Sequence, residues 1–411
     1  MSPPTASPFI TRVVIENYKS IAFCDVRLGS LNVLVGPNGS GKSNFLDALR
    51  FVNDACGGSL NDAIRRRGGI REIIRRSNDV KSNFGMRFEF RLPHGMDGHY
   101  TFRIQAHAAG GYRVVKEECA IDGHKDGELP LHFVMQDGDF DTNALSVNVR
   151  SAFSLPGDTN LLLALNGIGQ VAGGFEPVYE AFRSMRFYDI SPSDMRHLQP
   201  SGSADVLTSD GSNITGVLER LITRNEGAKE RIDEYLSRIV PTVHLVQPKT
   251  IVDRSILEFR QRGEKTWEPF LAPSLSNGTL RVLGILVALF QSTYNATTPT
   301  TLTAIEEPES TVHPGALRVL FDAMREASKS TQVIATSHSP DLLDDKNLDV
   351  DSILAVTVAD NETRIGPMDE AGRSVVRDRL FTVGELLRMN QIVPDAAATR
   401  PADHHAALFS G

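Results

Sequence analysis

Apolar residues along the chain fall into patterns that predict both buried strands and amphipathic helices. Ile10–Tyr18 is rich in β-branched residues and is predicted to be a strand. Leu31–Val35 is almost wholly apolar, which is typical of a strand buried on both faces of a parallel sheet. A glycine-rich segment follows it, and the next apolar residues recur at helical spacing: Phe45, Leu46, Leu49 and Val52. The first part of the chain therefore predicts strand, loop and helix.

The middle of the chain predicts mixed structure. Residues 84–121 are mostly β, with strands expected around 86–92, 100–105 and 112–120. Residues 122–200 contain too many glycines and prolines for a long helix. Residues 210–213 are expected to cap a helix, and two further strands are expected at 243–252 and 255–260. These patterns predict an α/β protein with an antiparallel β lobe and a mixed insertion.

The composition narrows the cellular compartment expected for the protein and the way in which it could contact nucleic acid. The longest apolar run, 282–290, is much shorter than the ~20 residues of a spanning helix, so we expect no membrane insertion. The N-terminus has no signal-peptide pattern, and three scattered cysteines without a CxxC pair fit a reducing compartment. We therefore expect a cytoplasmic protein. A net charge of −8 excludes a wholly basic nucleic-acid coat, so DNA contact requires a local patch.

Residues 36–43, GPNGSGKS, form a complete P-loop between the predicted strand and helix. In this context the glycines allow backbone N–H groups to point at phosphate oxygens at a helix N-terminus. Lys42 is expected to bridge the β- and γ-phosphates of ATP, and the Ser43 hydroxyl to hold Mg²⁺. The predicted nucleotide-binding residues are Gly36, Pro37, Asn38, Gly39, Ser40, Gly41, Lys42, Ser43 and Asn44.

A second apolar strand, within 300–309, ends in adjacent carboxylates beside the P-loop of a parallel sheet. Glu306 is expected to complete the Mg²⁺ site, and Glu307 to orient and deprotonate the attacking water. Such acids can also simply favour the start of the following helix, where Pro308 fits the first turn. The preceding P-loop favours the catalytic interpretation.

Two further segments carry candidate phosphate contacts. An apolar strand at Gln332–Ser337 leads to His338, which could bond the γ-phosphate of ATP and act with Glu307 in catalysis. The LSNGT motif, residues 275–279, opens an apolar helix, and Ser276 and Gly278 there could form a second anion site. Alone, each segment is also an ordinary strand end or helix cap.

The order of these motifs resembles that of ABC ATPases. Within that superfamily, IENYKS at 15–20, GKSNFLDALRF at 41–51 and IEEPESTVHP at 305–314 resemble the RecF, SMC and OLD-type branch. The resemblance implies a P-loop ABC-ATPase head that forms an ATP-dependent homodimer, head to tail. Ser276, Asn277 and Gly278 would then contact ATP held by the other subunit.

The resemblance also implies a division of the chain into parts, and the sequence departs from the family pattern at several positions. The expected parts are an N-terminal ABC half with the β lobe (1–124), an insertion (125–270), a C-terminal ABC half (271–390) and a loose tail (391–411). Glu306 stands where transporters have Asp, and His313 where many ABC proteins have Asp. The glutamine that follows the first lobe is not assigned, Gln136 being the nearest candidate. SMC arms are absent, and few residues follow His338 for a fused nuclease domain.

One basic cluster stands out against the acidic net charge, and it has two interpretations. It could follow a phosphate backbone or bind a partner. It could equally be a solvated face, since Asp62 and Glu72 are its neighbours. The cluster consists of Arg65, Arg66, Arg67, Arg71, Arg75 and Arg76.

These features lead to one main functional hypothesis and its rivals. The main hypothesis is a Mg²⁺-dependent ATPase that controls a DNA-directed activity or a separately encoded nuclease, in anti-phage defence. The rivals are a RecF-like DNA-repair ATPase and a nucleotide-gated scaffold with little turnover. A transporter ATPase is disfavoured by the SMC-like N-terminal segment, and a small GTPase by the absence of an NKxD motif.

Overall fold

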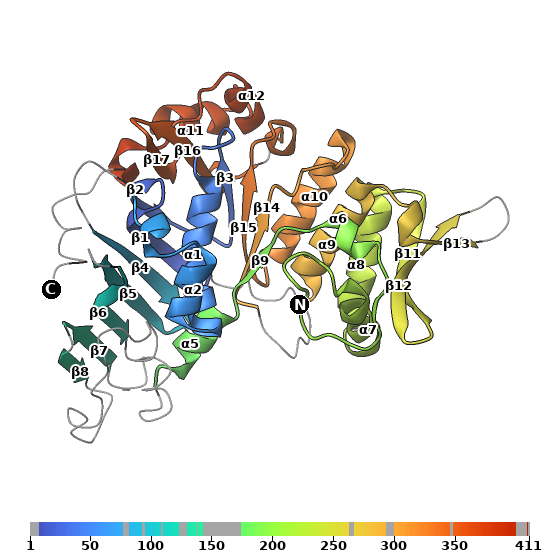
Figure 1. Ribbon diagram of the computed structural model, residues 1–411. Helices are drawn as coiled ribbons and strands as arrows, with labels where there is room; N and C mark the ends of the chain where they lie inside the picture. Colours follow the sequence, from blue (N-terminus) through green and yellow to red (C-terminus); the bar gives the residue numbers. More distant parts are fainter. Residues whose placement is uncertain are drawn as a thin grey trace.

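The computed structural model describes residues 8–76, 82–92, 95–107, 110–122, 130–137, 139–142, 174–262, 267–292, 300–345, 348–399 and 409. A 13-stranded sheet runs through it in the order β8-β7-β6-β5-β4-β1-β2-β17-β16-β3-β15-β14-β9 (Figure 1). Its strands are β1 (Ile10–Tyr18), β2 (Ile21–Arg27), β3 (Leu31–Val35), β4 (Asn83–Arg91), β5 (Asp97–Ala106), β6 (Tyr112–Ile121), β7 (Leu131–Gln136), β8 (Asp139–Thr142), β9 (Arg186–Tyr188), β14 (Leu302–Glu306), β15 (Gln332–Ser337), β16 (Ile353–Ala359) and β17 (Glu362–Pro367).

The two ends of this sheet differ in strand direction. β9, β14, β15, β3 and β16 pair in parallel, so their carboxyl ends meet at one edge. From β2 through β1 and β4 to β8 the pairing is antiparallel, which forms the predicted β lobe. The α/β class with an antiparallel lobe is confirmed, and the parallel end is where a nucleotide site can form.

Helices cover both faces of the sheet and create two hydrophobic cores. They are α1 (Lys42–Gly57), α2 (Leu60–Arg66), α3 (Ile70–Ile73), α5 (Glu176–Arg183), α6 (Pro192–Met195), α7 (Ile214–Arg224), α8 (Glu226–Ile239), α9 (Asn277–Phe290), α10 (Pro314–Ala327), α11 (Glu370–Arg377) and α12 (Val383–Arg388). Alternate residues of β3 enter opposite cores: Leu34 packs with α1, α2 and α5, while Val33 and Val35 pack with α7 to α10. This alternation puts α1 and α9 in different layers.

A second, 4-stranded sheet lies with α7 and α8 at the far end of the molecule (Figure 1). Its strands are β10 (Gln199–Pro200), β11 (Val243–Ile251), β12 (Arg254–Arg262) and β13 (Trp267–Leu271). The two expected strands here are present as β11 and β12. β2 and α8 are not among the predicted elements. No helix among the described residues is long and apolar enough to cross a membrane.

The C-terminal segment differs from the loose tail that the sequence predicts, at the positions that the structure describes. The Asp395 N–H donates to the Pro367 carbonyl at 2.8 Å, and Ile392 is buried. Phe409 packs against Val14 and Phe23 on the β lobe. The segment is therefore anchored at these points, because it covers apolar side chains of the sheet. Residues 400–408, 410 and 411 lie outside the described residues.

Candidate functional site

The P-loop connects β3 to α1 in a conformation that only glycine permits at two positions. A Cβ on Gly36 would lie 2.0 Å from the Val356 carbonyl oxygen. Gly41 has φ 102°, and a Cβ there would lie 2.1 Å from the Thr363 hydroxyl. That hydroxyl also donates to the Ser40 carbonyl at 2.9 Å. β16 and β17 thus hold the loop at the N-terminus of α1, where backbone N–H groups can receive phosphate.

The Lys42 ammonium lies across this loop. Its Nζ donates to the Gly36 carbonyl at 2.8 Å and to the Pro37 carbonyl at 2.9 Å. Burial lowers the pKa of Lys42, while the nearby charges of Glu307 and Glu309 act in the opposite direction. The lysine is therefore a partly desolvated cation at the P-loop, and its charge can attract the phosphates of a nucleotide.

Ser43 and Glu306, the two residues predicted to hold Mg²⁺, are in contact. The Ser43 hydroxyl donates to Glu306 Oε2 at 2.8 Å. Glu306 reaches this position because β14 is separated from β3 only by β15. A hydroxyl and one carboxylate are hard oxygen donors, and Mg²⁺ commonly takes only one or two protein ligands besides water and phosphate oxygens. The pair fits Mg²⁺, and no larger group of acids or histidines suited to a metal occurs among the described residues.

Glu307 begins a tight turn directly after β14 and meets His338 there. Its backbone has φ 43°, which is unusual for a residue other than glycine. The Glu307 N–H donates to the Thr336 hydroxyl at 3.1 Å, and Ser310 donates to Glu307 Oε2 at 3.3 Å. Glu307 Oε1 lies 3.3 Å from His338 Nδ1. The structure thus brings together the two residues that the sequence predicts to act on water and on the γ-phosphate.

A second carboxylate of this turn, Glu309, was missed by the sequence analysis. Its side chain is only 6% exposed, and Oε1 accepts hydrogen bonds from the Ser337 hydroxyl at 2.7 Å and the His338 N–H at 3.0 Å. Oε2 has no hydrogen-bond partner among the described residues. Glu309 therefore ties the turn after β14 to the segment that carries His338. The only signal in the sequence was a third acid close to Glu306 and Glu307.

The LSNGT motif lies at the N-terminus of α9, in the other layer. The Ser276 hydroxyl caps the helix by accepting the Thr279 N–H at 3.1 Å, and Gly278 belongs to the first turn. Asn277 Oδ1 accepts a hydrogen bond from Arg196 at 2.7 Å. Among the described residues, no hydrogen bond joins this motif to the P-loop of the same chain.

Comparison with known proteins agrees with this geometry. Residues 31–133 and 174–344 match the family model described as "AAA domain, putative AbiEii toxin, Type IV TA system", which is more than half of the chain. The chain belongs to this family.

Individual relatives and solved structures give the same general assignment. A segment of 92 residues is 32% identical to the DNA replication and repair protein RecF of Aliivibrio salmonicida, covering 21% of this chain and 24% of that protein. RecF of Vibrio cholerae is 44% identical over 44 residues, 10% of this chain and 12% of that protein. The chain thus matches about a quarter or less of these relatives' length. An SMC head solved with the C-winged helix domain of ScpA has the same fold (TM-score 0.51, 14% identity, 89% of this chain and 99% of that chain). This family member is a P-loop ATPase of the RecF/SMC-like kind, as the motifs predict.

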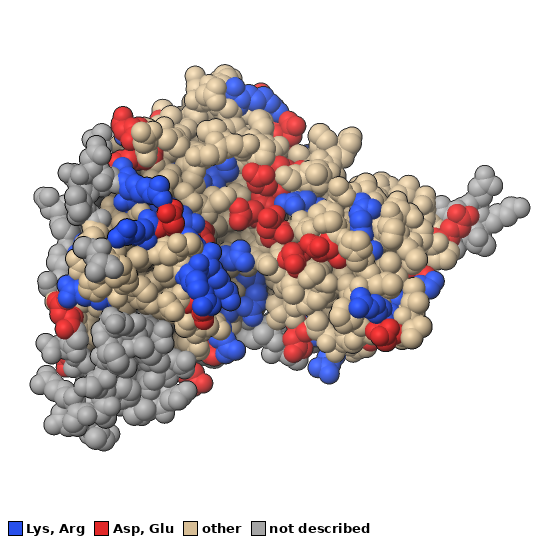
Figure 2. Space-filling view, in the orientation of Figure 1, with Lys and Arg blue, Asp and Glu red and all other residues tan. Residues whose placement is uncertain are grey.

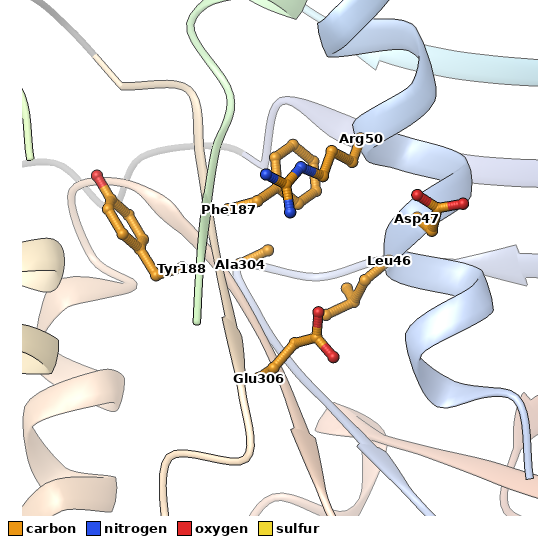
Figure 3. Close-up of a pocket in the computed structure, with 7 residues that line it drawn as sticks. All are labelled: Leu46, Asp47, Arg50, Phe187, Tyr188, Ala304 and Glu306. Atoms are coloured by element: carbon orange, nitrogen blue, oxygen red, sulfur yellow. The ribbon is translucent and has the colours of Figure 1, made fainter. Parts of the chain in front are cut away.

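A small pocket of this AAA-family protein adjoins Glu306, between α1 and the edge strand β9 (Figure 3). Arg50 extends from α1 toward Phe187, and Tyr188 lies on the other side of β9. No ion pair of Arg50 occurs among the described residues. The lining residues are Leu46, Asp47, Arg50, Phe187, Tyr188, Ala304 and Glu306. The pocket extends the candidate metal site along α1.

Gln136 is the wrong candidate for the glutamine that follows the first lobe. It lies in β7, next to one edge strand of the large sheet, whereas β14 lies next to the other edge strand. The chain instead reaches the nucleotide site through β9, and Asp189 is the first residue after that strand. His313 caps α10 by accepting the Gly315 N–H at 3.1 Å, so its ring supports this helix start.

Two arginines of the predicted basic cluster are structural, which corrects the expectation of one continuous surface. The Arg67 side chain is 5% exposed and pairs with Asp47 and Asp54, each at 2.9 Å. Arg75 pairs with Glu362 at 2.8 Å and is largely covered. Arg67 joins α2 to the preceding helix α1, and Arg75 pairs with a residue of β17 far along the chain, which the local charge pattern could not reveal.

The remaining arginines of the cluster are exposed. Figure 2 shows basic side chains gathered over α2 and the adjacent part of α1, near acidic side chains at the end of β14. Arg65, Arg66 and Arg76 each lie beside one acid. The exposed members are Arg65, Arg66, Arg71 and Arg76. The exposed part of the cluster is therefore smaller than predicted.

The buried pairs of Arg67 lead to a stability prediction. Arg67→Met is expected to lower the free energy of unfolding by ~3 kcal/mol, because Asp47 and Asp54 would lose the buried cation that they share and keep only the more exposed Lys19 and Arg66. Arg65→Met, at an exposed position of the same cluster, should change it by less than about 0.5 kcal/mol. Urea-induced unfolding of both variants measures the difference. Equal stability of the two variants would show that the Arg67 pairs do not support the fold.

Proposed function

We propose that this chain is a Mg²⁺-dependent ATP hydrolase that acts as a head-to-tail homodimer closed by ATP. The supporting observation is that, among the described residues, the LSNGT motif makes no hydrogen bond to the P-loop of its own chain. The P-loop, Glu306, Glu307 and His338 meet at the carboxyl ends of β3, β14 and β15, whereas the LSNGT motif belongs to α9 in the opposite layer. A second subunit, related by twofold symmetry, supplies the missing motif to each P-loop.

Each residue of the composite site has a separate role in this proposal. The loop N–H groups and Lys42 bind the phosphates of ATP, and Ser43 and Glu306 hold Mg²⁺. Bound Mg²⁺ supplies charge neutralisation on the phosphate oxygens. Glu307 orients a water molecule and accepts its proton, while His338 donates a hydrogen bond to the γ-phosphate.

Residues of the second subunit complete the site. Ser276, Asn277 and Gly278 of that subunit contact the γ-phosphate with a hydroxyl, an amide and the helix N-terminus. Their contribution requires that both subunits face the same nucleotide. Hydrolysis removes the γ-phosphate, and with it the contact that closes the dimer.

Sedimentation of the wild-type protein tests the ATP-dependent dimer. Mg-ATP is expected to shift the protein toward a dimer, whereas ADP or ATP with EDTA should not. Ser276→Arg provides the control, because a large cation at the motif should block closure while leaving the P-loop intact. A sedimentation coefficient independent of nucleotide would contradict head-to-tail assembly.

We further propose that the dimer controls a DNA-directed activity or a separately encoded nuclease in anti-phage defence. The proposal draws on the toxin–antitoxin description of the family and on the relatives named for DNA replication and repair. The rivals remain a RecF-like repair ATPase and a scaffold with little turnover. Negligible ATP turnover by a dimerising protein would favour the scaffold, and ATP-dependent gel shifts with gapped DNA alone would favour repair.

A further inference from the structure

Arg281, in the second turn of α9, joins three segments of the candidate site through one guanidinium. Its NH1 donates to the Ile190 carbonyl at 2.6 Å. Its NH2 donates to the carbonyls of Glu306 at 3.0 Å and Glu307 at 3.3 Å, and lies 3.6 Å from the Asp189 carboxylate. The side chain is 11% exposed. α9, the end of β14 and the segment after β9 are therefore held together by a planar fork of donors.

The turn that receives these bonds has an unusual backbone at both ends. Glu307 has φ 43° and Thr311 has φ 64°. Such conformations cost about 1 kcal/mol or more each, and they persist where the surroundings impose them. The turn containing the proposed hydrolytic carboxylate is thus held in place by its neighbours rather than by its own preference.

α9 supplies two of these constraints. Besides the Arg281 bonds, the first turn of α9 packs directly on the turn, since a Cβ on Gly278 would lie 2.3 Å from the Thr311 carbonyl oxygen. Among the described residues, the side-chain hydrogen bonds between α9 and this turn all come from Arg281. A shift of the LSNGT end of α9 must therefore move the Glu307 backbone or break these bonds.

We propose that Arg281 is a positioning residue that couples the two ATP sites of the dimer. This inference rests on the proposed function, in which the LSNGT motif touches ATP held by the other subunit while Glu307 acts on ATP held by its own. When the motif engages nucleotide across the interface, Arg281 transmits the position of α9 to Glu307. ATP bound at one site thereby sets the position of the Glu307 carboxylate at the other site. Because the dimer is symmetric, this coupling is reciprocal.

The test compares two substitutions of Arg281 with a matched arginine on another helix. Arg281→Met removes the fork and the charge, whereas Arg281→Lys keeps the charge but cannot bridge carbonyls on two segments. The control is Arg220→Met, because Arg220 is also buried and donates to the Gln291 carbonyl, at the opposite end of α9. ATP hydrolysis against ATP concentration gives kcat, KM and the Hill coefficient, and sedimentation gives dimerisation.

Wild type and Arg220→Met are expected to hydrolyse ATP cooperatively, with a Hill coefficient above 1. Arg281→Met should lower kcat by about tenfold, because a displaced carboxylate orients water poorly, while KM changes less than about threefold and ATP still produces the dimer. Both Arg281 variants should lose cooperativity. Arg281→Lys keeps the test valid if Arg281→Met does not fold.

Two results would overturn the coupling role. One is a folded Arg281 variant with the Hill coefficient of the control, and the other is a wild-type dimer that hydrolyses ATP without cooperativity. A wild-type protein that never dimerises on ATP would instead refute the proposed function itself. The two failures are therefore distinguishable.

Discussion

Glu307→Gln is expected to lower kcat for ATP hydrolysis by ~100-fold or more while leaving the ATP dissociation constant within about threefold. A general base contributes roughly 10²–10⁴ to rate, and an amide cannot accept the proton of water at neutral pH. Glutamine has the shape of Glu307 and can still accept the Ser310 hydrogen bond, so the turn should be retained. Steady-state turnover and fluorescent-ATP titration measure the two effects.

The same substitution should make the ATP-bound dimer accumulate, because the closed state is not discharged by hydrolysis. Glu230→Gln, at an exposed position on α8, is the matched control and should behave as wild type. Turnover in Glu307→Gln equal to that of this control would remove Glu307 from the proposed mechanism.

Lys42→Ala is expected to weaken ATP binding by ~100-fold or more. Charge-assisted hydrogen bonds contribute about 1.5–3 kcal/mol each, and in the proposed function Lys42 makes them with two phosphates. Its ammonium is already partly desolvated, with its hydrogen bonds directed to the carbonyls of Gly36 and Pro37. Calorimetric titration with ATP measures the loss.

Lys19→Ala serves as the control for Lys42→Ala, since Lys19 pairs with Asp47 outside the P-loop. It should leave ATP affinity unchanged within about threefold. ATP affinity retained in Lys42→Ala would contradict the assignment of the P-loop lysine.

The sequence predicted the parts of the site whose signals are local. The P-loop was predictable because its glycines, the strand before it and the helix after it are contiguous, and Gly36 and Gly41 do lie where a Cβ cannot fit. The contact between Ser43 and Glu306 followed from the parallel-sheet expectation, which places the ends of buried strands at one edge.

Other features depended on contacts that no local pattern contains. Arg67 looked like its exposed neighbours, but its acids come from α1, so its burial was hidden. Gln136 was close to the expected position in sequence order, but its strand lies at the far end of the sheet. Arg281 and Glu309 do not belong to a recognisable sequence motif. Their hydrogen-bond partners, Ile190 and His338, lie in segments that are separated from them along the chain by at least one helix.

The edge strand β9 shows why part of the site could not be predicted from the sequence. It has only three residues, Arg186–Tyr188, and follows a long region rich in glycine and proline. Its pairing with β14 is decided by tertiary packing rather than by its own pattern. The segment after it, which reaches Arg281, could therefore not be placed from sequence.

Mixing two inactive variants tests the head-to-tail composite site most directly. Lys42→Ala lacks a working P-loop, and Ser276→Arg lacks a working LSNGT motif, so each homodimer should be inactive. In a mixed dimer, the intact P-loop of one subunit meets the intact motif of the other. Mixing is expected to restore ATPase activity well above that of either variant alone, since each mixed dimer holds one complete site. An equimolar mixture that remains as inactive as its components would contradict the composite site.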